Sequence, residues 1–145
     1  MVSLWTMVLF VHVVGATLWV GGQLTLTLVV LPLARRLIAD DTRASVMPAV
    51  GRRFARITLA VFLPVQIATG VALAAHAGVT WESLAEPGYG RTLAAKLALV
   101  VVAMVAAAGH GIAAARGRAG LARAASLCAL VCSLGVVLLA TALAG

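Results

Sequence analysis

Residues 12–23 read HVVGATLWVGGQ and lie inside the first long apolar segment of the chain. On a helix, where successive residues are about 100° apart, one face carries His12, Gly15, Ala16, Trp19, Gly22 and Gln23. One ionisable ring, one indole, one amide and several small residues therefore share this face, and the bulky aliphatic residues point elsewhere. The pattern predicts a helix face that can hold a ligand.

The composition indicates a membrane protein. The chain has 145 residues, of which 63% are hydrophobic and only 10% charged, and its mean hydropathy is +1.13. Soluble domains carry about 25% charged residues, and a membrane-spanning helix needs roughly 20 apolar residues. Four stretches meet that requirement, at approximately 4–33, 55–76, 92–115 and 121–144. The sequence predicts one all-α domain over residues 1–145, an integral membrane four-helix transmembrane bundle.

The arginines predict how this bundle is oriented. Seven of the ten lie between the first and second or the third and fourth apolar stretches, and Arg56 and Arg123 lie within the first three residues of the second and the fourth. Basic loops stay in the cytoplasm, so we expect the loop that contains Glu82 and Glu86, and both termini, on the outer side. The net charge of +7 is then a topology signal with some affinity for anionic lipid headgroups. No basic stripe is interleaved with aromatic residues, so nucleic acid is not an expected partner.

Two features of the second apolar stretch matter for the site. Gln66 and Thr69 share one helix face with Phe62, Gly70 and Leu73. Pro64 cannot donate a backbone hydrogen bond, which predicts a distortion that frees the carbonyl of Ala60. The preceding residues, 34–53, contain Asp40, Asp41 and Pro48, and we expect a flexible loop there.

Ionisable side chains inside a bilayer are functional candidates because they are costly to bury. Here they are His12, Lys96 and His110, with His76 near the outer surface. His12 is either a core histidine bonded to Gln66 or Thr69, or a ligand of a metal or haem. Lys96 either extends to the outer headgroups or faces the His12 cavity, where it would bind an anionic group such as a porphyrin propionate.

A second possible site lies nearer the cytoplasmic side. His110 has about the same expected depth as Cys128, so a soft Cu(I) site can be drawn from His110, Met104, Cys128 and Cys132. Cysteine and methionine at helical spacing are more often packing residues, so this site is the less favoured one. His12 and His110 differ too much in expected depth to bind opposite faces of one haem.

Three stretches resemble one protein family. The stretch from His12 to Gln23 is similar to the H-x6-W-x-G-G segment of the copper resistance D (CopD) membrane proteins. Residues 52–74, RRFARITLAVFLPVQIATGVALA, resemble that family's R-F-[S/A]-R…TG helix, and residues 89–100, YGRTLAAKLALV, resemble its YG-R-x-L-x-x-K helix entry. The resemblance implies a protein of copper uptake or homeostasis in the bacterial cytoplasmic membrane. Family members are often about twice as long, so we expect a homodimer or a membrane-protein partner.

The pairing of His12 with Lys96 is similar to a second family, the HemJ-type protoporphyrinogen oxidases. These are small four-helix membrane proteins that bind haem b, with a histidine on the first helix and a lysine on the third. That resemblance implies haem b instead of copper, and a membrane redox enzyme. A third interpretation is a structural subunit of a membrane complex. In the leading interpretation an outer cavity is lined by His12, Trp19, Gln66, Thr69 and Lys96.

Overall fold

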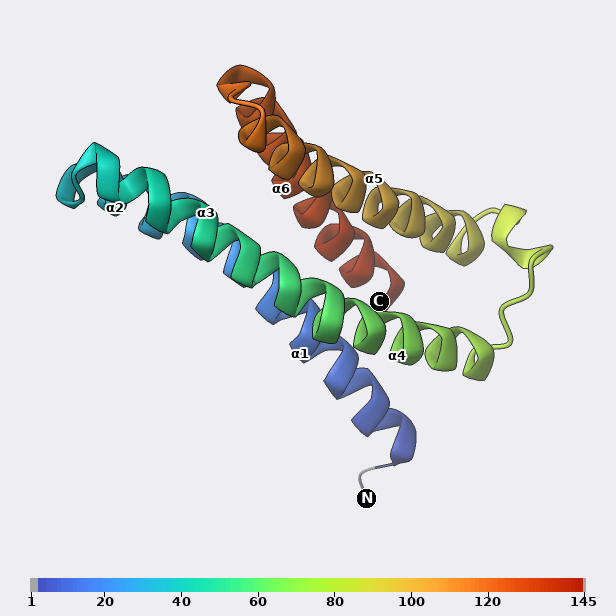
Figure 1. Cartoon of the computed structure of the whole chain (residues 1–145). Coiled ribbons are helices and arrows are strands. Elements are labelled where there is room, and N and C mark those ends of the chain that lie inside the picture. The colour runs from blue at the N-terminus through green and yellow to red at the C-terminus, as the bar shows by residue number, and fades with distance from the viewer. Residues whose placement is uncertain (1–2, 145) are drawn as a thin grey trace. The chain divides into compact units, whose positions relative to one another are not determined.

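The computed structural model describes residues 3–144, which contain helices and turns but no strand (Figure 1). Four helical segments are long and apolar enough to cross a membrane: Leu4–Leu37, Asp40–His76, Tyr89–Ala115 and Ala119–Leu143. The all-α class and the four apolar spans are thereby confirmed, while the outer position of the termini stays a prediction. The chain divides into two compact units, Met1–Ala77 and Gly78–Gly145, and each is a helical hairpin.

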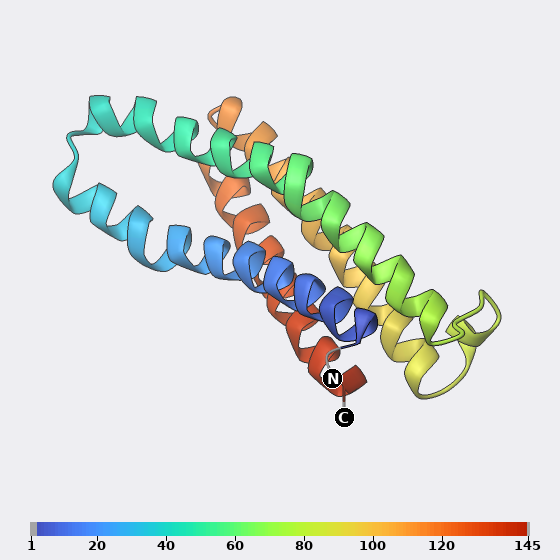
Figure 2. The same ribbon diagram turned by 90° about the horizontal axis from the view of Figure 1, so that it is seen from below.

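The first unit consists of two interrupted arms that run antiparallel (Figures 1 and 2). The first arm contains α1 (Leu4–Thr25), the π-helical segment η1 (Leu26–Val30) and α2 (Leu31–Leu37). The second arm contains α3 (Asp40–Ile57), the π-helical segment η2 (Thr58–Phe62) and α4 (Leu63–His76). The closest packing between the two arms is that of α1 on α4.

Each π-helical segment lies directly before a Leu-Pro pair. Proline lacks an N–H, and its ring crowds the carbonyl four residues earlier, so a proline inside a helix distorts the turn before it. Both arms widen just before the proline, and the N–H of Leu31 bonds to the carbonyl of Leu26, five residues back. The N–H of Leu63 bonds in the same way to Thr58. The distortion expected around Ala60 therefore takes the form of a widened turn.

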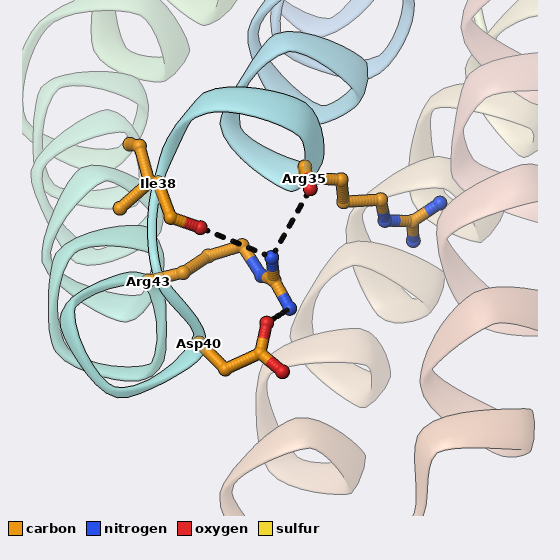
Figure 3. Close-up of polar contacts among 4 residues, drawn as sticks. All are labelled: Arg35, Ile38, Asp40 and Arg43. Atoms are coloured by element: carbon orange, nitrogen blue, oxygen red, sulfur yellow. Dashed lines mark hydrogen bonds and ion pairs between the residues drawn. The ribbon is translucent and has the colours of Figure 1, made fainter.

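The expected loop at residues 34–53 is largely helical. Only Ile38 and Ala39 separate α2 from α3. Arg43 ties this turn together: its guanidinium pairs with Asp40 and donates to the carbonyls of Arg35, at 3.4 Å, and Ile38, at 3.3 Å (Figure 3). Hydropathy misses the start of α3 because this helix is polar, with two aspartates in its first turn, where negative charge is favourable.

The second unit is a hairpin of α5 (Tyr89–Ala115) and α6 (Ala119–Ala144), which pack antiparallel along much of their length (Figure 1). Small residues lie buried in it, among them Ala103, Ala113, Ala129 and Ser133. Close approach of backbones through small residues is the usual way in which membrane helices associate. The short helix η3 (Ser83–Ala85) precedes α5.

The loop before α5 sits against the start of that helix. Gly88 has a φ of +90°, a conformation that favours glycine. A Cβ atom on Gly90 would overlap the backbone carbonyl of Ser83. Arg91 donates from Nε to the carbonyl of Ala85 at 3.1 Å, and its backbone N–H bonds to Glu86. The Tyr-Gly-Arg sequence is thus the point where loop and helix meet.

We expect Gly90→Ala to destabilise the protein by about 1–3 kcal/mol, because the added methyl meets rigid backbone rather than a movable side chain. The measurement is thermal unfolding of the detergent-purified protein. Gly109→Ala is the matched control on the same helix, since a Cβ there meets nothing within 4 Å. Equal melting temperatures for the two variants would contradict the contact.

Candidate functional site

His12 and Thr69 join the two arms of the first unit. Nδ1 of His12 lies 2.8 Å from Oγ1 of Thr69. The only hydroxyl proton of Thr69 is donated to the carbonyl of Val65, at 2.6 Å, so Oγ1 accepts from the ring. His12 therefore carries its proton on Nδ1 when neutral, and the lone pair of the ring lies on Nε2.

Gln66 holds the backbone of the same histidine. Its Nε2 donates to the carbonyl of His12 at 2.7 Å. A carbonyl oxygen has two lone pairs, so it accepts this bond in addition to one within the helix. Gln66 and Thr69 are three residues apart and lie on one face of α4. Together they fix both the ring and the backbone of His12.

Three glycines make room for side chains of the opposite arm. A Cβ on Gly15 would lie 2.5 Å from Nε2 of Gln66, and one on Gly70 would lie 3.3 Å from Cε1 of His12. A Cβ on Gly22 would lie 2.6 Å from the ring of Phe54, whereas one on Gly21 would meet nothing within 4 Å. Of the two adjacent glycines, Gly22 therefore makes the contact between the arms.

Aromatic stacking joins the two arms at the end of the hairpin opposite the α2–α3 turn. The rings of Trp5 and His76 are parallel within 9°, and their centroids are 3.8 Å apart. His76 is exposed and lies at the end of α4. This histidine therefore belongs to a contact about two turns of α1 away from His12.

Two predicted residues are not part of the His12 hydrogen bonds. Trp19 is half-buried on α1, two turns from His12. Lys96 is half-buried on α5 and belongs to the second unit. That Lys96 faces His12 stays a prediction.

The four residues of the less favoured copper site all lie on the second hairpin. Nδ1 of His110 donates to the carbonyl of Ala122 at 2.8 Å, which ties α5 to the first turn of α6. Cys128 is exposed and Cys132 half-buried, both as free thiols, and Met104 is half-buried on α5. Within residues 3–144, no group of three or more His, Cys, Asp or Glu side chains could hold a metal ion.

His12 is held at its ring by Thr69 and at its backbone by Gln66. A histidine that binds a metal commonly donates its other ring N–H to a group that orients the ring. A copper ion, which favours imidazole and thiolate or thioether ligands, would need further donors beside His12.

Comparisons with known proteins do not assign the chain to a family. No family model matches the chain, and no curated protein or solved structure matches it significantly. The class that the fold defines is that of a multi-pass α-helical membrane protein, on the length and apolar character of the four helices.

The sequence offers Gln66 and Thr69 as hydrogen-bond partners of His12, and both bonds form, that of Gln66 to the backbone carbonyl. Sequence reasoning missed the contact of Phe54, whose ring packs on Gly22. A usable signal was present: Gly15 and Gly22 are seven residues apart, so they lie on one face of α1 and can receive two side chains of a neighbouring helix.

We expect Thr69→Val to leave the Nδ1–H of His12 without its acceptor, at a cost of about 1–3 kcal/mol. The ring of His12 should also lose its preference for the Nδ1–H tautomer, which nitrogen-15 NMR of the labelled histidine measures. Thr69→Ser should retain both stability and tautomer because it keeps the hydroxyl.

Thr17→Val is the matched control for this experiment. The Thr17 hydroxyl bonds the carbonyl of Val13 within its own helix, at 2.9 Å, as that of Thr69 bonds Val65. Removing it should leave the His12 ring signals unchanged. An unchanged His12 tautomer in Thr69→Val would contradict the assignment.

Proposed function

We propose that the chain is a multi-pass protein of the bacterial cytoplasmic membrane that works in copper homeostasis, with His12 as its ligand-bearing residue. The observation that carries this proposal is the hydrogen bond from His12 Nδ1 to Thr69, which joins the two arms and fixes the orientation of the imidazole. In this proposal copper is a transported substrate that passes His12. We name copper because the three stretches described above resemble the CopD proteins.

The resemblance gains support from what its residues do in each hairpin. The first stretch supplies His12, Gly15 and Gly22, which contact the second arm. The second stretch supplies Gln66 and Thr69. The third supplies the glycine and arginine on which the loop before α5 rests. Each of the three stretches therefore supplies residues that make contacts within its own hairpin.

The small number of metal ligands that one chain offers favours the participation of more than one chain in the copper proposal. Each chain offers one oriented imidazole in its first hairpin, and imidazole binds copper best together with further nitrogen or sulfur ligands. A homodimer would bring a second His12, and a membrane-protein partner would bring other donors. A complete copper path therefore involves a second copy or another membrane protein.

Haem b is the second candidate, and the single oriented imidazole favours it. His12 would be the residue that binds the haem iron, and a bound haem would supply one-electron redox chemistry. In this alternative Thr69 keeps the His12 ring in its tautomer, and Lys96 is the residue expected to meet an anionic group of the porphyrin. The chain would then be a membrane oxidoreductase that resembles the HemJ-type enzymes.

We expect His12→Asn to abolish the effect of the protein on cellular copper accumulation while keeping the fold. The asparagine amide nitrogen takes about the place of Nδ1 and can donate to Thr69, but nothing replaces Nε2. The measurement is copper content of cells that make equal amounts of the wild-type and variant proteins. His12→Ala should lose copper accumulation and, in addition, melt at a lower temperature.

One absorbance spectrum separates the two candidates. Protein purified from haem-supplied cells shows a Soret band in the haem alternative, and His12→Asn removes it. Copper accumulation that is the same for wild type and His12→Asn, with no Soret band in either protein, would contradict both functions.

A further inference from the structure

A groove runs along the first hairpin, between its two arms, where Phe54 packs on Gly22. Its volume is about 560 Å³, and it is open at the surface. Leu18, Gly21 and Leu26 line it from the first arm, and Val50 and Ile57 from the second. The groove exists because α1 packs closely on α4 but not on α3.

The apolar lining of this groove includes one charged residue. Among the described residues that line the groove, only Arg53 is charged. Its neighbours on α3, Arg52 and Arg56, are exposed arginines, and no described residue of the lining is acidic. Asp40 of the same unit is paired with Arg43. The groove thus combines a long apolar floor with a guanidinium that has no carboxylate beside it.

We propose that this groove binds one anionic phospholipid, with the phosphate on Arg53 and one acyl chain along the apolar floor. The four apolar spans indicate that lipid is the medium around this hairpin. A guanidinium matches phosphate geometry with two parallel hydrogen bonds. The positive charge of Arg53, in a lining whose described residues include no acidic one, favours a headgroup with net negative charge over a zwitterionic one.

A second groove on the same hairpin shows why the charge matters. It has a volume of about 280 Å³ and lies nearer the α2–α3 turn, lined by Leu33, Leu37, Val46 and other apolar residues. No described residue of its lining is charged. Its lining offers a lipid phosphate no charged partner, and Arg43 beside it is paired with Asp40, so we place the lipid site in the groove at Arg53. This inference does not depend on copper or haem.

The headgroup is tested by native mass spectrometry of the full, delipidated protein, titrated with phosphatidylglycerol and with phosphatidylcholine of identical acyl chains. The first phosphatidylglycerol should bind several-fold tighter than phosphatidylcholine. Arg53→Gln should weaken it about tenfold, as expected for one lost charge-assisted contact. The matched control is Arg52→Gln, which makes the same charge change outside the groove and should weaken binding less than twofold.

The acyl chain is tested by Gly21→Leu, which fills the floor of the groove without a backbone clash. It should weaken the first binding event of both lipids while the melting temperature of the lipid-free protein stays within a few degrees of wild type. Equal losses in Arg52→Gln and Arg53→Gln would overturn the site in favour of diffuse charge. Unchanged phosphatidylglycerol binding in Gly21→Leu, or equal affinity for the two lipids in wild type, would overturn it as well.

Discussion

The first hairpin depends on one histidine that is held twice. In a bilayer, helices gain no hydrophobic free energy from meeting each other, so close packing and hydrogen bonds between helices decide which faces pair. His12 donates to Thr69 and accepts from Gln66, and Gly15 and Gly70 let these side chains approach. The bond that joins the arms is also the bond that sets the ring's tautomer, so the fold itself fixes the protonation pattern of the neutral ring.

The second hairpin is held in another way. Its helices meet through buried alanines and a serine whose hydroxyl bonds the carbonyl of Ala129 in its own helix, at 2.8 Å. Its polar contact between helices, from His110 to Ala122, lies at the turn. Close backbone approach therefore stabilises this hairpin along its length, and its interior tolerates little added volume. The two units accordingly differ in which substitutions they can absorb.

Hydropathy was sufficient to predict the all-α class and the four spans, because a long apolar run has few alternatives. Helical periodicity placed Gln66 and Thr69 on one face and offered both as partners of His12, but it could not say which atom each would bind. The start of α3 was missed because this helix is polar. The role of Gly90 was also missed, since it depends on where the carbonyl of Ser83 lies in space.

The widened turn η2 changes the direction in which side chains before and after it point from the second arm. Phe54 and Gln66 are twelve residues apart, so on an uninterrupted α-helix they would point about 120° away from each other. Five steps of roughly 80° each, as in a π-helix, reduce that angle to about 20°. Gly15 and Gly22, which receive these two side chains, also differ by about 20° along α1. The length of η2, more than its composition, therefore aligns two contacts that a regular helix would turn apart.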